Sequence, residues 1–388
     1  MSDQRIEAGG RKPELLVVGA GVIGLSCAWR AARAGVRTLV LDAGGVERAS
    51  EVAAGMIAPI GEASWGEDAL HVAAMASADA WPSFAGELAA DADRPVPYRR
   101  PGALHVALDR DEAAELRRVH ELHRRLGLEA TWLRGSECRR LEPGLATSVA
   151  GGLEAPGEAE VDPRSLLHAL RLAVAAAGAE IREETAVAEV LVDGGRATGV
   201  VLANGERLDA ERILIATGAR AGGELLPDEV RPPVRPVMGE ILRLRSRGAE
   251  RPCERLVVTE RVYVVPREDG EVVIGATMED RGFDLRVTAG GVHELLREAY
   301  RVLPEVAELE LLECTAGLRP TTPDNAPVVG ETAIGGLLLA GGHHRNGILM
   351  APLTANAIEA LLTGAEPPAE LERLSPARFE RAPEGVGA

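Results

Sequence analysis

The segment 14–42 constrains the fold most, because it contains the pattern of one complete βαβ unit. ELLVV predicts a short buried strand, LSCAWRAARAG has the apolar spacing of a helix, and VRTLVLD predicts a second strand. GAGVIG lies between the first strand and the helix, with Gly19, Gly21 and Gly24 in the GxGxxG pattern. Glycines at these positions allow a tight turn and let the backbone approach a pyrophosphate at the helix N-terminus.

Asp42 ends the predicted second strand, 23 residues after Gly19. A carboxylate at this position can accept a hydrogen bond from a ribose hydroxyl of a dinucleotide. The combined pattern predicts a dinucleotide-binding site, since GxGxxG is far more specific when it stands between a strand and a helix. The alternative is that the three glycines only allow close packing.

Composition narrows the class of protein. The length of 388 residues suggests two or three domains, and 46% apolar with 27% charged residues is typical of a soluble globular protein. The net charge of −17 argues against a nucleic-acid partner. Lys12 is the only lysine and precedes the first apolar run, so a Schiff-base enzyme and a Walker A loop are both excluded.

Cysteine spacing and hydropathy point to a cytoplasmic protein with no metal site. The four cysteines have no short-spaced pair, which argues against a zinc site, a redox pair and a disulfide framework. The polar N-terminus lacks the apolar core of a signal peptide. The longest weakly polar run, 15–29, is shorter than the roughly 20 residues of a membrane span.

The rest of the chain alternates predicted helices and strands. Helices are expected at 67–90, 111–128, 163–177 and 288–303, and in the segment PLTANAIEALLTG. Strands are expected within 181–219 and 237–275, and in ELLECTAGLRP and GLLLAGG. The chain after Ala365 is rich in Pro and Glu, so we expect it to be peripheral.

Two later segments favour FAD over NAD. ILIATGA is a predicted strand that ends in a small-residue turn, and GGHHRNGILMAP places a glycine-rich turn before a helix. Such a turn can aim backbone N–H groups at the anionic edge of a reduced flavin. The alternative is an ordinary strand-to-helix loop, which the polar residues HHRN in an apolar context make less attractive.

The motifs resemble those of the D-amino-acid oxidase-like FAD-dependent amine oxidases, and within them the glycine oxidases of thiamine biosynthesis. The shared motifs are GAGVIG, AAGM, VYVVPR, IGATM, AGLRPTTPD and GGHHRNGILMAP, which together span 15–364. The resemblance implies FAD as cofactor. The implied FAD contacts are Gly19, Gly21, Val22, Ile23, Gly24, Asp42, Ala43, Ala54, Gly55, Met56, Val187, His343, His344, Arg345, Asn346, Gly347, Ile348 and Leu349.

The resemblance also implies a substrate site. Arg319 would hold the substrate carboxylate in a two-pronged, charge-assisted pair, and Tyr263 would hydrogen-bond the same group. Arg345 would lie near substrate or flavin, and Met278 and Met56 match positions that line the family's pocket. From the residues alone, Tyr263 and the two methionines can equally be core side chains.

Two departures from related enzymes matter. Monomeric sarcosine oxidases attach flavin through a cysteine just before their Thr-Pro-Asp, where this chain has Gly317, with Cys314 three residues earlier. We therefore expect noncovalent FAD. Those enzymes also use a lysine to promote the reaction with oxygen, and this chain has none to offer.

The implied reaction is oxidative deamination of glycine and other small amines, such as sarcosine and small D-amino acids. A hydride would pass from the amine carbon to flavin N5, giving an imine or oxo acid, ammonia and, with oxygen as acceptor, hydrogen peroxide. The glycine imine would supply thiazole synthesis. No base stands out; His343 and His344 fit a structural role better than a base role. The alternatives are a D-amino-acid dehydrogenase with a non-oxygen acceptor and a non-enzymatic flavin-binding subunit.

The expected fold is α/β with two domains. A Rossmann-like, discontinuous FAD-binding domain would comprise 14–60, 145–230 and 312–375. A substrate-binding domain with a large, mostly antiparallel sheet would comprise 61–144 and 231–311, leaving 1–13 and 376–388 as peripheral tails. The family resemblance implies a homo-oligomer.

Overall fold

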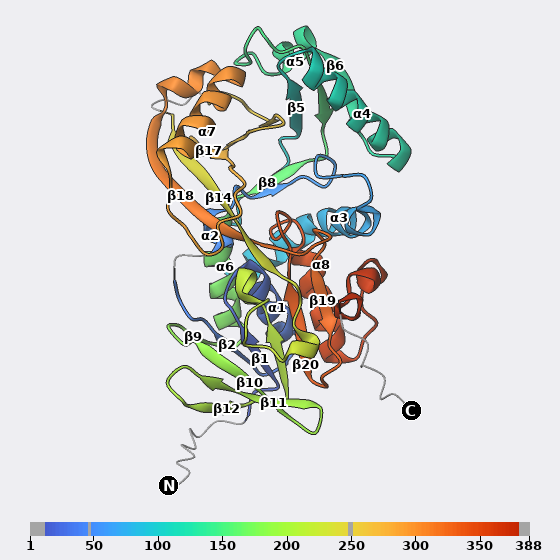
Figure 1. The fold of residues 1–388 in the computed structure, drawn as a ribbon, viewed down its shortest axis with the longest axis vertical. Helices are drawn as coiled ribbons and strands as arrows, with labels where there is room; N and C mark the ends of the chain where they lie inside the picture. Colours follow the sequence, from blue (N-terminus) through green and yellow to red (C-terminus); the bar gives the residue numbers. More distant parts are fainter. Residues whose placement is uncertain (1–11, 46–47, 247–250, 380–388) are drawn as a thin grey trace.

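The computed structural model describes residues 12–45, 48–246 and 251–379. Its six-stranded sheet has the order β19–β20–β13–β1–β2–β9 and lies in the lower half of Figure 1. All neighbours are parallel except β19 and β20. The predicted βαβ unit is confirmed, and its first two strands are buried throughout, as expected for a parallel sheet covered on both faces. The strands are β1 (Leu15–Val18), β2 (Thr38–Leu41), β9 (Glu180–Arg182), β13 (Arg212–Ile215), β19 (Val328–Glu331) and β20 (Leu337–Gly341).

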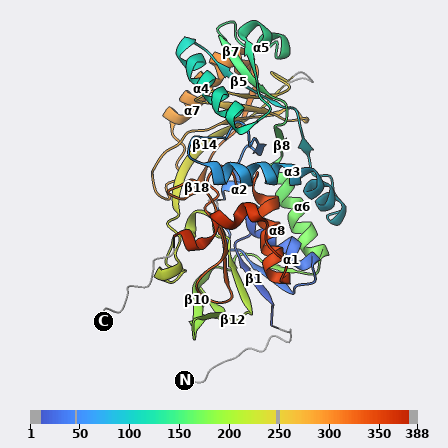
Figure 2. The same cartoon turned by 90° about the vertical axis from the view of Figure 1, so that its right-hand side faces the viewer.

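Helices cover this sheet and form the largest core. α1 packs against α6 and α8, while α3 lies across α6 and α8 (Figure 2). Trp29 and Trp81 both meet Phe84 edge to face in this core. Asp162 caps α6 as predicted, accepting hydrogen bonds from the backbone N–H groups of Arg164 and Ser165. The helices are α1 (Val22–Arg33), α2 (Ala49–Val52), α3 (Asp68–Asp91), α6 (Pro163–Ala176) and α8 (Ala351–Thr363).

The second large sheet has eight strands in the order β18–β14–β17–β16–β15–β5–β7–β6. Its pairs are antiparallel except β15 with β5, which confirms the expected mostly antiparallel sheet. The domain boundaries given above stay a prediction. The strands are β5 (Ala103–Ala107), β6 (Thr131–Arg134), β7 (Gly151–Ala155), β14 (Arg235–Arg245), β15 (Leu256–Val258), β16 (Tyr263–Pro266), β17 (Glu271–Gly275) and β18 (Glu310–Thr321).

Smaller elements complete the fold. Asn204 and Gly205 form the predicted turn between antiparallel β11 and β12, with Gly205 at φ 87°. The remaining strands are β3 (Met56–Ile57), β4 (Tyr98–Arg99), β8 (Ala159–Val161), β10 (Val187–Asp193), β11 (Arg196–Leu202) and β12 (Arg207–Asp209). The remaining helices are α4 (Arg110–Leu126), α5 (Gly135–Leu141), α7 (Ala289–Val302) and the short 3₁₀ helices η1 (Gly218–Arg220), η2 (Asp228–Val230), η3 (Pro304–Glu308), η4 (Ala369–Leu374) and η5 (Pro376–Arg378).

The chain after Ala365 is less peripheral than its composition suggests. Leu371 and Leu374 of η4 are buried in the core that α1, α3 and α8 share. Arg378 donates hydrogen bonds to the carboxylate of Asp324, in the turn after β18. Two leucines three positions apart in a Pro- and Glu-rich segment are too weak a pattern to predict that this segment packs on the core.

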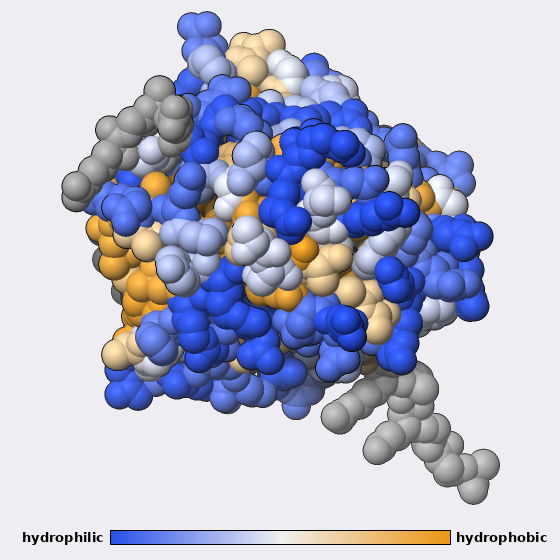
Figure 3. Space-filling model, turned by 90° about the horizontal axis from the view of Figure 1, so that it is seen from above, coloured by the Kyte–Doolittle hydropathy of each residue, from blue (hydrophilic) through white to orange (hydrophobic). Residues whose placement is uncertain are grey.

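The face of the molecule above the eight-stranded sheet is mostly hydrophilic, with an apolar patch at its left margin and smaller apolar areas nearer the centre (Figure 3). Exposed large apolar side chains include Tyr300 on α7 and Leu311 and Leu312 on β18, an edge strand. Within 12–45, 48–246 and 251–379, no helix combines the length and apolar character needed to cross a membrane.

Candidate functional site

A cavity of about 510 Å³ lies where the two large sheets meet. It begins at the turn between β1 and α1, where Gly19 has φ 110° and a side-chain carbon would come within 2.5 Å of the Ala216 carbonyl oxygen. A side-chain carbon at Gly24 would lie 1.9 Å from the Gly19 carbonyl oxygen, so Gly24 allows strand and helix to pack and does not itself line the cavity. Gly21 faces the cavity, and its nearest neighbour would be Ser50 Oγ at 3.4 Å.

Asp42 lies at one end of the cavity and is held by basic groups. Its Oδ2 lies 2.6 Å from Arg48 Nη2 and 3.2 Å from Arg171 Nη2, and its Oδ1 accepts from the Gly44 N–H. A buried carboxylate needs such partners to stay charged. It retains lone pairs for a ribose hydroxyl, and Val187 lines the same end.

The middle of the cavity is lined by the loop Ala53–Met56. Gly55 has φ 78°, and a side-chain carbon there would lie 1.9 Å from the Val161 carbonyl oxygen, so the loop fits closely against the next strand. Arg267, at the end of β16, donates to the Ala54 carbonyl and pairs with buried Glu160.

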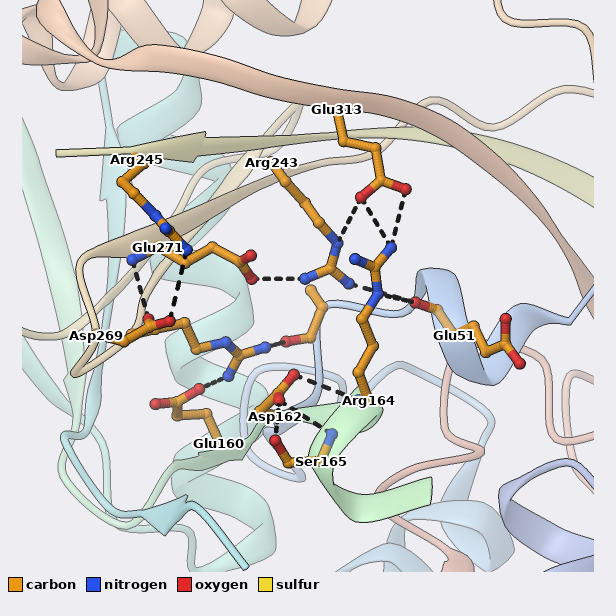
Figure 4. A network of polar contacts seen from close by, with 12 residues as sticks. Glu51, Glu160, Asp162, Arg164, Ser165, Arg243, Arg245, Asp269, Glu271 and Glu313 are labelled. Atoms are coloured by element: carbon orange, nitrogen blue, oxygen red, sulfur yellow. Dashed lines mark hydrogen bonds and ion pairs between the residues drawn. The ribbon is translucent and has the colours of Figure 1, made fainter. Parts of the chain in front are cut away.

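Two further arginines hold the start of this loop (Figure 4). Arg243 on β14 and Arg164 on α6 each donate to the Glu51 carbonyl oxygen at 3.3 Å. Arg243 is only 1% exposed and pairs with Glu271 at 2.6 Å, while Arg164 pairs with Glu313 on β18. The loop that lines the cavity is therefore tied to the eight-stranded sheet and to α6 through charged hydrogen bonds.

The turn from His343 to Leu349 closes the cavity beside α8. His343 Nε2 lies 3.0 Å from Thr354 Oγ1, and His344 Nδ1 lies 2.8 Å from Thr321 Oγ1. Burial lowers the pKa of each imidazole to about 3, so both are neutral at physiological pH. Neutral, hydrogen-bonded rings fit the structural role that the sequence favours for this pair.

Arg319 and Tyr263 lie together at the other end of the cavity. Arg319 Nη1 donates to the Thr277 carbonyl at 3.1 Å, and its guanidinium lies close enough to the Tyr263 hydroxyl for each group to shift the pKa of the other. Burial lowers the pKa of Arg319 and raises that of Tyr263. Gly239 and Gly275 make this arrangement possible, because side-chain carbons there would lie 2.2 Å from Arg319 Nη1 and 2.3 Å from the Tyr263 hydroxyl.

Arg345 lines the same end and pairs with Glu62, whose Oε2 lies 2.7 Å from Arg345 Nη2. Met278 is 57% exposed and is not among the cavity-lining residues. Gly317 lines the cavity, whereas no cysteine of the described segments does.

The structure thus brings most of the proposed residues to one cavity. Met278 and Gly24 lie outside its lining, and Ser50, Arg48 and Glu62 join it without having been predicted. Ser50 accepts a hydrogen bond from the Val22 N–H at 3.1 Å. These three residues belong to a short helix and to irregular loops, where neither periodicity nor a motif marks them.

A glycine turn, a buried acid and a long cavity fit a flavin dinucleotide. The cavity has open space at Gly21, where a pyrophosphate is expected, and α1 begins at the next residue, Val22. The DAO family, described as FAD dependent oxidoreductase, matches residues 14–361.

Several known proteins are similar over most of the chain. Glycine oxidase of Geobacillus kaustophilus is 33% identical, over 91% of this chain and 93% of that protein. A solved structure of glycine oxidase from Geobacillus kaustophilus superposes with a TM-score of 0.87 at 32% identity, covering 94% of this chain and 98% of that one. The bifunctional protein ThiO/ThiG of Trichormus variabilis is 33% identical over 95% of this chain.

That match covers 55% of the bifunctional protein, so the chain spans about half the length of such two-part relatives. The matched family covers most of the described fold, including both large sheets. The chain therefore belongs to the DAO family of FAD-dependent oxidoreductases and is an FAD-dependent enzyme.

Proposed function

We propose that this enzyme oxidises glycine and other small amino acids, with the substrate carboxylate bound at Arg319. The observation that carries the proposal is the environment of this guanidinium. Among the described residues, no carboxylate lies within ion-pair distance of Arg319, although the residue is only partly exposed and burial lowers the pKa of its guanidinium. A buried cation without a counter-ion is costly, so the site is suited to an anionic ligand.

The chain's own residues supply orientation. Arg319 and the Tyr263 hydroxyl present donors to the same carboxylate, which fixes the position of the adjacent amine carbon. The turn at His343 and the loop at Ala54 would hold noncovalent FAD alongside. When bound, FAD supplies the acceptor for the hydride of the amine carbon.

No strong base is needed if the amine reacts in its neutral form. His343 and His344 have weakly basic rings that already contact threonine hydroxyls. The products would be an imine or oxo acid, ammonia and, with oxygen as final acceptor, hydrogen peroxide. The glycine imine would feed thiazole synthesis, a proposal supported by the similarity to glycine oxidases and to ThiO/ThiG proteins.

A second candidate is a D-amino-acid dehydrogenase with a non-oxygen acceptor. The observation that favours it is the absence of any lysine beyond Lys12, which removes one known route for promoting oxygen reduction. Turnover with a dye under anaerobic conditions, together with no oxygen uptake in air, would support this alternative over the oxidase.

Anaerobic mixing of the FAD-loaded enzyme with a panel of amines tests the proposal. Glycine, sarcosine and D-alanine should bleach the flavin absorbance of the wild type. Arg319→Ala should keep FAD but lose about 100-fold or more in the second-order rate of reduction, since a charged partner is removed from a desolvated pair. Arg118→Ala, at an exposed pair on α4, is the control. Wild-type flavin that no amine reduces would refute the proposal.

A further inference from the structure

Glu62 places a negative charge inside the substrate end of the cavity. It lies in the irregular segment between β3 and α3 and lines the cavity together with Tyr263, Arg319 and Arg345. Its Oε2 is buried, and within the described part of the chain its one charged contact is the ion pair with Arg345. Glu62 also acts electrostatically on both Arg319 and Tyr263, so the four groups form one cluster.

The backbone next to Glu62 is held in place by two side chains, Glu158 and His105. The carboxylate of Glu158, which is fully buried, accepts a hydrogen bond from the Gly61 N–H at 2.5 Å. The same carboxylate lies 3.3 Å from His105 Nε2 on β5. A side-chain carbon at Gly61 would come within 2.2 Å of the His105 ring, so the loop packs directly on that imidazole.

These contacts fix the backbone beside Glu62 and so limit the positions that its carboxylate can reach. Burial opposes protonation of His105, but the charges of Glu158 and then of Glu62 raise its pKa overall. Protonation of His105 would strengthen its contact with Glu158, which in turn accepts from the Gly61 N–H. The loop is therefore held to the eight-stranded sheet one residue before the carboxylate that faces the cavity.

The charges of this cluster sum to one positive unit. Arg319 and Arg345 contribute two positive charges, Glu62 contributes one negative charge, and Tyr263 and His344 are neutral. One positive unit matches one substrate carboxylate. Without Glu62 the sum would be two, which matches a ligand with carboxylates at both ends.

We propose that Glu62 is a specificity-determining residue that pairs with Arg345 and makes the site select monocarboxylate amines over dicarboxylate amines. This inference rests on the proposed function, because it takes Arg319 as the site of the first carboxylate. A second carboxylate reaching Arg345, whose side chain is 43% exposed, must displace Glu62 or lie beside its negative charge, and both arrangements cost energy. Glu62 thus acts by repulsion, against the wrong ligand.

Ligand titration of the oxidised, FAD-loaded protein tests the proposal without turnover. Glycolate and diglycolate replace the amine nitrogen of a mono- and a dicarboxylate substrate with oxygen, and binding is followed by the change in flavin absorbance. Glu62→Gln should tighten diglycolate binding by about tenfold or more, while glycolate gains much less. Glu62→Asp keeps the charge and should restore the wild-type preference.

A double variant assigns the effect to the pair. In Glu62→Gln combined with Arg345→Gln, the gain for diglycolate should disappear, because its second carboxylate has lost its partner. An unchanged preference in Glu62→Gln, or a gain that persists without Arg345, would overturn the role of Glu62 alone. Wild-type protein that binds neither ligand, and behaves like Arg319→Ala, would overturn the proposed function and this inference with it.

Discussion

The guanidinium of Arg319 occupies the space that a side chain at position 239 would fill. A side-chain carbon on Gly239 would lie 2.2 Å from Nη1, 2.5 Å from Nη2 and 2.6 Å from Cζ of Arg319. The two residues lie on neighbouring strands, β14 and β18, which pair directly beside the cavity. The position of the Arg319 guanidinium therefore depends on the lack of a side chain at Gly239 as well as on its own hydrogen bonds.

Gly239→Ala should separate substrate binding from folding. The atoms that the new methyl group meets are the far end of a flexible side chain, so the fold can accommodate it by moving the guanidinium. We expect a change in unfolding free energy within about 1 kcal/mol and a rise of about tenfold or more in KM for glycine. Steady-state kinetics and urea unfolding measure the two effects.

The control is Gly86→Ala, at an exposed position of α3 with no atom within 4 Å of the new carbon. It should leave KM unchanged and stabilise the helix slightly. An unaltered KM in Gly239→Ala would show that Arg319 does not need its present position.

Changing Gly21 or Gly24 to alanine should affect different properties, FAD affinity in the first variant and stability of the apoprotein in the second. Gly21→Ala adds a carbon that meets only Ser50 Oγ at 3.4 Å, so the apoprotein should keep its stability. The same carbon enters the cavity where the pyrophosphate is expected, so FAD affinity should fall by about tenfold or more. Gly24→Ala instead meets the Gly19 carbonyl at 1.9 Å and should destabilise the apoprotein itself.

Isothermal titration with FAD and thermal unfolding of the apoproteins distinguish these outcomes. Equal loss of apoprotein stability in both variants would contradict the separate roles. Normal FAD affinity in Gly21→Ala would contradict placement of the pyrophosphate at this turn.

Removal of Arg267 should loosen the loop at Ala54. Arg267 is 5% exposed and Glu160 1%, so Arg267→Met leaves a buried carboxylate with Arg99 as its remaining partner. We expect a loss of about 3 kcal/mol in unfolding free energy, as is typical when one member of a buried pair is removed.

The comparison is Arg118→Met, at a pair whose members are 75% and 61% exposed, where a loss of at most about 1 kcal/mol is expected. Urea unfolding of the apoproteins gives both values. Equal losses would mean that the network in Figure 4 contributes no more than surface charges do.

Acid should destabilise the fold through buried histidines. Burial, with a contribution from the nearby His105, lowers the pKa of His123 from 6.5 to about 4, and the ring is 2% exposed. The unfolded chain therefore takes up a proton between pH 6.5 and 4 that the folded chain refuses. The stabilisation is complete above pH 6.5 and is lost as the pH falls toward 4, at roughly 1.4 kcal/mol per pH unit.

His123→Leu should remove one proton from this dependence and flatten the plot of unfolding free energy against pH. Among the residues that the structure describes, none is hydrogen-bonded to a ring nitrogen of His123, so the substitution should cost little at pH 7. The pKa values of His343 and His344 are lower still, at about 3, so these two rings account for pH dependence of the unfolding free energy that remains in the variant. An unchanged slope in His123→Leu would mean that this ring is protonated in the folded chain.

The sequence predicts the parts of this protein that depend on local pattern. The βαβ unit, the Asp162 cap and the Asn204–Gly205 turn follow from short-range preferences and are confirmed. The mostly antiparallel sheet follows from a run of strand-like segments. The Arg319–Tyr263 contact was approached only through family resemblance, because nothing local in the chain joins residues 56 positions apart.

The remaining site residues depend on packing between distant segments. Glu62 lies in an irregular loop whose position is set by Glu158, nearly a hundred residues further on. The space that Gly239 leaves is also filled by a distant residue, Arg319. Buried leucines of η4 likewise dock on a helix almost three hundred residues earlier. No periodicity in the chain encodes such pairings, so they become visible only once the segments are folded together.

The order of strands in the six-stranded sheet has a consequence for biosynthesis. β1 lies beside β13, and β13 lies beside β20, so the sheet draws on the first, middle and last parts of the chain. A ribosome must release residues beyond 341 before the central strands have all their neighbours. The cavity is therefore completed only after β20 and the turn that follows it have been translated, and a chain terminated before β20 lacks part of the cavity lining.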